Sequence, residues 1–158
     1  MVARFIDDPT EVTIGCYFEK RPVGLLGLDT PEEVSLLGID PQNSAGLSVE
    51  IIATHPGSNG VGSILFEEAA TASQQQGYSG RLQLTAATEQ SKKVYEALGF
   101  IQDGPKWTLN PASLENKDRW SFEDEKWRLK KYLSKELATH FSTLGKTGHS
   151  RKRQRTSE

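Results

Sequence analysis

The chain has 158 residues, 35% of them hydrophobic and 25% charged, which is the composition of one soluble globular domain. Its one cysteine, Cys16, excludes an intramolecular disulfide framework and a multi-cysteine zinc site, so we expect no metal centre and a reducing, cytoplasmic compartment. No apolar run is long enough to span a bilayer, and the N-terminus lacks a signal-peptide pattern, so we expect no membrane partner.

The net charge of −2 is unevenly distributed along the chain. Five basic residues and one acidic residue lie from Gly145 onward, so the preceding part is the more acidic. We therefore expect a single domain over residues 1–144 and a basic, disordered tail over residues 145–158. The segment from Lys146 to Arg155 is of a kind that binds nucleic acid or a nuclear import receptor, and a solvated tail without a partner is the alternative.

The first half of the chain reads mainly as strands. Residues 11–19 alternate between apolar and polar side chains, which predicts a half-buried strand, and the apolar run at 23–28 predicts a second strand antiparallel to it. Residues 30–40 stay open between a short helix, with Thr30 as N-cap and Pro31 in its first turn, and a further strand. Residues 41–46 have the composition of a loop, and the strand over 47–55 is apolar enough to be central in a sheet.

The second half alternates between helices and strands. We expect a helix over 61–76 that ends at Gly77, a strand over 81–88, and a helix over 89–98 between Thr88 as N-cap and Gly99. A strand from 100 to 109, interrupted at Gly104 and Pro105, and a loop over 110–118 follow. The last elements expected are a strand near 126–132 and a helix to about residue 143.

The glycine-rich turn between the strand at 47–55 and the helix at 61–76 is the clearest functional signal. Such a turn leaves backbone N–H groups unpaired at the positive end of a helix dipole. Phosphate and pyrophosphate groups bind at helix ends of this kind. The stretch therefore predicts a ligand with a phosphate tail.

Three motifs in this order resemble the GNAT superfamily of acyl-CoA-dependent N-acetyltransferases. Gly60, Val61 and Gly62 follow a strand and precede a helix, as in the family's pyrophosphate loop, Q/R-x-x-G-x-G/A. The strand over 81–88 corresponds to the family's parallel strand, which splays from the first to admit the pantetheine arm. The segment from Ser91 to Phe100 (SKKVYEALGF) is similar to the family's A/S-x-x-x-Y-x-x-x-G-F motif.

The resemblance implies an α/β (α+β) fold with a mixed, mostly antiparallel central sheet, a parallel splayed strand pair and flanking helices. It implies acetyl-CoA as cofactor and a primary amine on a protein, peptide or small molecule as acceptor, with the oligomeric state open and a homodimer among the alternatives. Gly57 stands where the motif has Gln or Arg, so we expect the phosphate cradle to rely on backbone amides. The implied cofactor-binding residues are Ala53, Thr54, Gly57, Ser58, Asn59, Gly60, Val61, Gly62, Ser63, Thr88 and Ser91.

Acyl transfer to an amine also needs a base and a proton donor for the departing thiolate. The motif implies that Tyr95 places its phenol near the sulfur of CoA, where it would act as a general acid. Glu50 lies in the central strand, where an unpaired carboxylate is expensive to bury, so it is the candidate base. The alternative is that Glu50 lies on an exposed or loop-covered face of the sheet or pairs with a lysine. His55 has a suitable intrinsic pKa and is the alternative base.

Two other functions remain compatible with the sequence. The same fold without turnover would be an acyl-CoA-binding or regulatory module, which the missing Gln or Arg in the loop permits. Alternatively, the basic tail from Lys146 to Arg155 would make the chain a nucleic-acid-associated protein.

Overall fold

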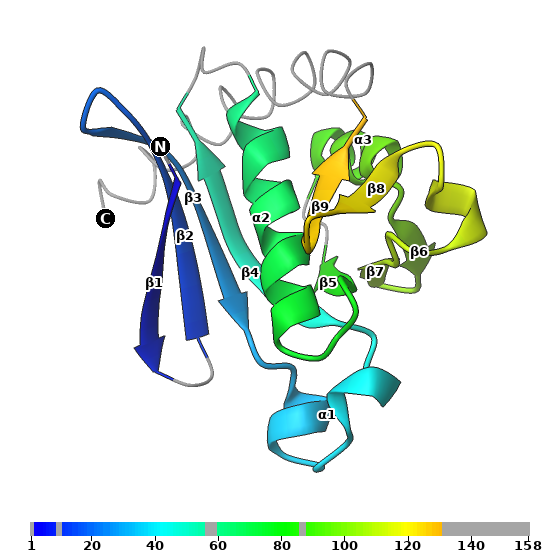
Figure 1. Ribbon diagram of the computed structural model, residues 1–158. Helices are drawn as coiled ribbons and strands as arrows, with labels where there is room; N and C mark the ends of the chain where they lie inside the picture. The colour runs from blue at the N-terminus through cyan, green and yellow to red at the C-terminus, as the bar shows by residue number, and fades with distance from the viewer. Residues whose placement is uncertain (1, 9–10, 56–59, 86–87, 131–158) are drawn as a thin grey trace.

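The structure, a computed structural model, describes residues 2–8, 11–55, 60–85 and 88–130 (Figure 1). Its strands are β1 (Val2–Asp8), β2 (Glu11–Phe18), β3 (Arg21–Asp29), β4 (Leu47–Thr54), β5 (Leu82–Thr85), β6 (Ile101–Asp103), β7 (Lys106–Leu109), β8 (Trp120–Glu123) and β9 (Lys126–Leu129). Its helices are α1 (Glu32–Ser35), α2 (Val61–Gln75) and α3 (Glu89–Leu98), with 3₁₀ turns at Pro41–Asn43 and Leu114–Asn116. None of the helices described is long and apolar enough to cross a membrane.

The strands β1 to β7 form one sheet in the order β1-β2-β3-β4-β5-β7-β6, and β8 pairs with β9 in a separate hairpin. Within the large sheet, β4 and β5 are parallel and every other neighbouring pair is antiparallel. The mixed, mostly antiparallel sheet with one parallel pair and flanking helices is therefore confirmed.

Four local predictions were wrong or incomplete. The strand β1 was not predicted, and it pairs with β2 from Val2↔Cys16 onward. The segment 100–109 is a hairpin of two strands, β6 and β7, with Gly104 at a φ of 63° in its turn. The strand β8 was missed because the turn to β9 has no glycine, although Asp124 and Glu125 both adopt positive φ. Residues 30–40 contain a helix of one turn, whose N-cap is Pro31 instead of Thr30.

The helix α2 covers one face of the sheet and builds the main core. A β-carbon added to Gly24 of β3 would lie 2.4 Å from Cγ1 of Val61, so the helix backbone approaches that strand closely. Leu26, Leu28 and Leu65 are almost completely buried in this layer. The glycine at 24 therefore permits the contact between β3 and the first turn of α2.

Aromatic side chains join the two longer helices. The rings of Tyr95 and Phe66 lie 6.2 Å apart between centroids, and those of Tyr95 and Phe100 lie 5.5 Å apart. Trp107 lies 6.4 Å from Tyr95. Pairs at these separations stabilise a core beyond their buried area. Trp107, Trp120 and Trp127 are all buried in the protein interior.

The hairpin of β8 and β9 lies against α2 (Figure 1). The backbone N–H of Trp127 donates to Oγ1 of Thr71 over 3.0 Å, and the N–H of Leu129 donates to Oε2 of Glu67 over 2.8 Å. Burial raises the pKa of Glu67, whereas the hydrogen bond from Leu129 and the charge of Arg128 act in the opposite direction. The strand β9 thus runs antiparallel to α2, towards the N-terminus of that helix. The predicted strand at 126–132 matches β9, and the predicted helix to residue 143 lies outside the described residues.

Candidate functional site

The N-terminus of α2 is built to receive an external group. Gly60, the N-cap, has φ 79° and ψ −5°, a left-handed conformation that favours glycine, and no side chain caps the helix. A β-carbon at Gly60 would meet nothing within 4 Å, so the space beside the helix start is open among the described residues. The first helical hydrogen bond runs from the N–H of Ile64 to the carbonyl of Gly60, which leaves the N–H groups of the first turn for another acceptor.

Ser63 supplies an independent sign of a missing partner. Its side chain lies in the first turn of α2 and is 2% exposed. Its Oγ atom has no hydrogen-bond partner among the described residues. A buried hydroxyl without a partner costs free energy, so an unpaired one beside an open helix N-terminus marks a position for a polar ligand atom.

Part of the predicted phosphate loop lies outside the described residues. Gly57, Ser58 and Asn59 belong to that part, so their predicted contacts stay predictions. Gly60, Val61, Gly62 and Ser63 are described, and they form the cap and first turn of α2 as the sequence predicted.

The parallel strands β4 and β5 meet at one end only. Leu47 pairs with Leu82 and Ser48 with Gln83, and no other described residues of the two strands pair with each other. On its other side β4 pairs with β3 as far as Gly24↔Thr54. Alternate backbone groups of residues 49–54, with Ala53 and Thr54 among them, therefore face the gap beside β5 without a strand partner among the described residues. An extended ligand with amide groups can pair with such an edge.

A β-bulge lies at the point where β4 separates from β5. Gly27 pairs with Ile51 and Leu28 with Val49, so Glu50 is the extra residue. Glu50 is exposed, and its Oε1 accepts a hydrogen bond from Oγ of Ser48 over 2.8 Å. The expectation of a costly buried position was therefore wrong, and the alternative of an exposed position is confirmed. Neither the bulge nor the contact with Ser48 could be predicted from local sequence, because a bulge depends on how the strand pairs with its neighbour.

Glu50 faces away from α2. The buried side chains of Leu26 and Leu28 face the helix, so the alternate residues of β3 and their partners on β4 face the opposite side. On that side Leu25 and Ile51 are 39% and 49% exposed. An acceptor that approaches the bulge from this side would meet Glu50 without displacing core side chains.

Tyr95 lies in α3, within the aromatic cluster. It is 7% exposed, and burial raises the pKa of Tyr95 to about 12. Its hydroxyl forms no hydrogen bond with a described residue, whereas its ring contacts Phe66, Phe100 and Trp107. The side chain is thus rigidly held and remains protonated at neutral pH.

Thr88 and Ser91 form a reciprocal cap at the start of α3. The N–H of Ser91 donates to Oγ1 of Thr88, and the N–H of Thr88 donates to Oγ of Ser91, each over 3.1 Å. The predicted N-cap is confirmed. The two side chains are already engaged in this capping box, and their contact with a cofactor stays a prediction.

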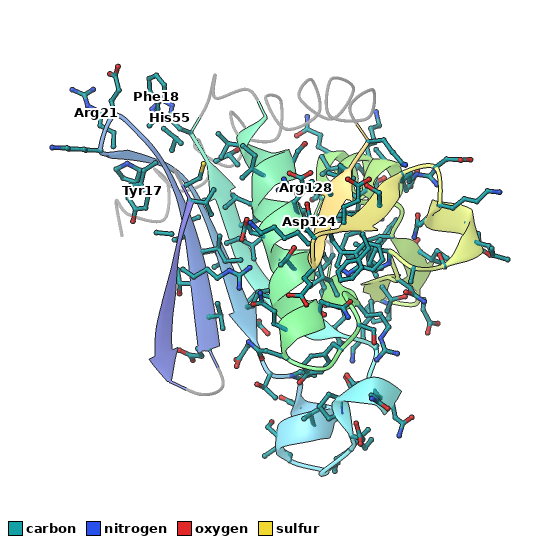
Figure 2. The ribbon with its side chains drawn as sticks, in the orientation of Figure 1. Tyr17, Phe18, Arg21, His55, Asp124 and Arg128 are labelled. Atoms are coloured by element: carbon teal, nitrogen blue, oxygen red, sulfur yellow. The ribbon has the colours of Figure 1, made fainter. Side chains whose placement is uncertain are left out.

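His55, the alternative base, follows β4 directly. Its backbone N–H donates to the carbonyl of Val23 over 2.8 Å, which extends the pairing of β3 and β4 by one residue. Its side chain lies with Tyr17, Phe18 and Arg21 at one end of the sheet (Figure 2). No group of three or more potential metal ligands occurs in the described part of the chain.

The geometry fits a ligand that carries both a pyrophosphate and an extended amide chain. The family model of the acetyltransferase (GNAT) family matches residues 1–100 of the sequence. The chain belongs to the GNAT family. Members of this family use acetyl-CoA, which is therefore the cofactor, and its pyrophosphate and pantetheine arm suit the open end of α2 and the gap beside β4.

Solved structures similar to the chain include one from E. coli. It is the solution NMR structure of the candidate N-acetyl transferase YhhK from E. coli bound to coenzyme A. The two chains share 16% sequence identity and a TM-score of 0.46, and the match covers 65% of this GNAT chain and 73% of YhhK. No curated protein sequence matches the chain significantly.

Proposed function

We propose that the protein is an N-acetyltransferase that transfers the acetyl group of acetyl-CoA to a primary amine on a protein, peptide or small molecule. The observation that supports this most directly is the combination of two open features on adjoining elements. The N-terminus of α2 has an uncapped first turn with the unpaired Ser63 hydroxyl, and β4 has an unpaired backbone edge that leads to it. The acceptor class is the part of the proposal that rests on family membership alone.

The chain's own residues would bind two parts of the cofactor, the pyrophosphate and the pantetheine arm. The N–H groups of Val61, Gly62 and Ser63, together with the Ser63 hydroxyl, donate to the pyrophosphate, and the helix dipole favours its negative charge. The backbone groups of β4 near Ala53 and Thr54 pair with the pantetheine amides and polarise the thioester carbonyl. When bound, acetyl-CoA supplies the acetyl group as an activated thioester.

Tyr95 is the proposed hydrogen-bond donor to the CoA sulfur. With a pKa raised to about 12, its phenol stays protonated over the whole physiological range. An ordinary thiol has a pKa of about 8.5, so a thiolate leaves without taking a proton from so weak an acid. Tyr95 therefore stabilises the negative charge that develops on sulfur by donating a hydrogen bond, and solvent can supply the proton later.

Glu50 is the proposed acceptor of the amine proton. The bulge turns its carboxylate to the face of the sheet where an acceptor can approach, and Ser48 holds one of its oxygens through a 2.8 Å hydrogen bond. Because Glu50 is exposed, the proton can reach it through a water molecule as well as directly.

A CoA-binding module without turnover is the second candidate. The burial of Tyr95 among three aromatic rings fits this candidate too, because a purely structural tyrosine would have the same surroundings. Nucleic-acid association through the tail, and the boundary of the domain at residue 144, remain predictions because residues 131–158 are not described.

The release of free CoA thiol from acetyl-CoA, measured with a panel of primary amines, tests the proposal. We expect amine-dependent thiol release that Tyr95→Phe reduces. Binding of acetyl-CoA by calorimetry without any amine-dependent release would instead identify the binding module. Absence of binding would overturn both.

A further inference from the structure

The hairpin between β2 and β3 ends beside the N-terminus of α2. The last residues of β4 pair with the first residues of β3, as in Gly24↔Thr54. Gly24 also lies against Val61 in the first turn of the helix. Arg21 begins β3 only three residues before Gly24, which corresponds to about 10 Å of extended chain. Figure 1 shows this hairpin tip at the same end of the sheet as the start of α2.

The tip presents a combination of side chains that the fold does not use. Phe18 is 67% exposed, so its ring contributes little to the core. Lys20 and Arg21 are exposed and form no ion pair within the described part of the chain. Glu19 occupies the same turn, which leaves the tip with a net positive charge. Figure 2 shows Phe18, Arg21 and His55 gathered at this end.

An exposed aromatic ring beside two cations matches the chemistry of a phosphorylated nucleoside. Aromatic side chains stack on bases, and exposed Lys and Arg bind phosphate oxygens by charge-assisted hydrogen bonds. CoA carries an adenine and a 3′-phosphate on the side of its pyrophosphate that is remote from the thiol. A pyrophosphate at the N-terminus of α2 would place that nucleotide within reach of the arginine side chain.

We infer that Phe18, Lys20 and Arg21 form a subsite for the 3′-phosphoadenosine end of CoA. The two cations hold the 3′-phosphate, and the ring of Phe18 stacks on adenine. This inference rests on the proposed binding of acetyl-CoA at α2. The subsite would also compensate for Gly57, which stands where the family motif has Gln or Arg. The positive charge would come from the β2–β3 hairpin instead of from the pyrophosphate loop.

Calorimetric titration with CoA and with 3′-dephospho-CoA tests the subsite. We expect the wild-type protein to bind CoA about tenfold more tightly than dephospho-CoA. The double variant Lys20→Gln/Arg21→Gln should lose about tenfold in affinity for CoA and less than about twofold for dephospho-CoA, which removes the preference. Phe18→Ala should weaken binding of both ligands by about fivefold, since both contain adenine.

The β8–β9 hairpin offers a matched control. The φ angles of its turn, 53° at Asp124 and 62° at Glu125, are similar to those of Glu19 and Lys20. Two cations, Lys126 and Arg128, lie in the strand that follows. The double variant Lys126→Gln/Arg128→Gln removes the same charge and should leave both affinities within about twofold.

The outcomes separate the inference from the function on which it rests. Equal wild-type affinity for CoA and dephospho-CoA, or a loss in the Lys20/Arg21 variant that is the same for both ligands, overturns the subsite while CoA binding stands. Equal losses in the Lys20/Arg21 and Lys126/Arg128 variants also overturn it, because they would reflect net charge alone. No binding of either ligand to the wild-type protein overturns the proposed function and the subsite together.

Discussion

The unpaired hydroxyl of Ser63 allows binding and stability to be separated by a single substitution. In the free protein this buried Oγ has no partner among the described residues, and such a group costs about 1–3 kcal/mol. Ser63→Ala removes the cost, so we expect the free energy of unfolding to rise by about 1 kcal/mol and Tm to rise by about 3 °C. A hydrogen bond to a charged phosphate contributes about 1.5–3 kcal/mol, so the same change should weaken acetyl-CoA binding at least tenfold.

Ser73 provides the control for this experiment, because it is a fully buried serine in the same helix. Its Oγ donates to the carbonyl of Arg81, far from the N-terminus of α2. Ser73→Ala should lower the free energy of unfolding by about 1 kcal/mol and leave acetyl-CoA affinity unchanged. Thermal unfolding and calorimetry on both variants give the two readouts. A Ser63→Ala protein that is destabilised like Ser73→Ala, or that keeps wild-type affinity, would refute the reasoning.

The site and the residues that support it allow four further predictions. Tyr95→Phe should lower kcat at least tenfold with acetyl-CoA affinity within about twofold, and an unchanged kcat would remove the phenol from the mechanism. In the folded protein the pKa of Tyr95 is raised to about 12 from an ordinary value of 10, so its stabilising contribution is complete below pH 10 and is lost as the pH rises from 10 to 12. Urea unfolding should show a smaller loss over that range in Tyr95→Phe than in the wild type. Glu67→Gln keeps an acceptor for the N–H of Leu129 without a buried charge, so the free energy of unfolding should stay the same or rise. Glu67→Ala removes the acceptor and should lower the free energy of unfolding by about 1–3 kcal/mol. Equal losses in the two variants would show that the hydrogen bond to Leu129 does not stabilise the fold. Gly60→Val forces a β-branched residue to φ 79° and should abolish acetyl-CoA binding. Gly60→Asn should retain part of the binding, because asparagine tolerates that conformation. Equal acetyl-CoA affinity in the two variants would mean that the turn is not part of the site.

The helices that sequence patterns predicted well are those with characteristic capping residues at their ends. The helix α3 begins at Thr88 and ends before Gly99, and α2 is followed by Gly77 with a φ of 93°. Few other residue types are as common at these capping positions, so the helix ends could be located from the sequence. The strand β8 and the bulge at Glu50 were not predictable in this way. The turn at Asp124 and Glu125 uses residues that seldom mark a hairpin, and the bulge arises from how β4 matches β3.

In the candidate site, too, features that depend on local sequence could be predicted, and features that depend on the packing of distant elements could not. The open end of α2 follows from glycine and the helix dipole, which are local properties, so it could be predicted from Gly60 and Gly62. The surroundings of Glu50 depend on which face of the sheet α2 covers, which local sequence does not specify. For that reason the expected burial of Glu50 was wrong, while the buried position of Tyr95 and its aromatic neighbours was compatible with its motif.

The short contact between β4 and β5 has a consequence for the protein without its cofactor. In the described part of the chain two residue pairs join the strands, and beyond them the side of β4 that faces β5 has no strand partner. Edge strands with unpaired backbone groups attract other chains. Acetyl-CoA bound along this edge would take the place of a further strand and cover those backbone groups. By mass action, this binding would also stabilise the folded protein, and more so as the concentration of acetyl-CoA rises.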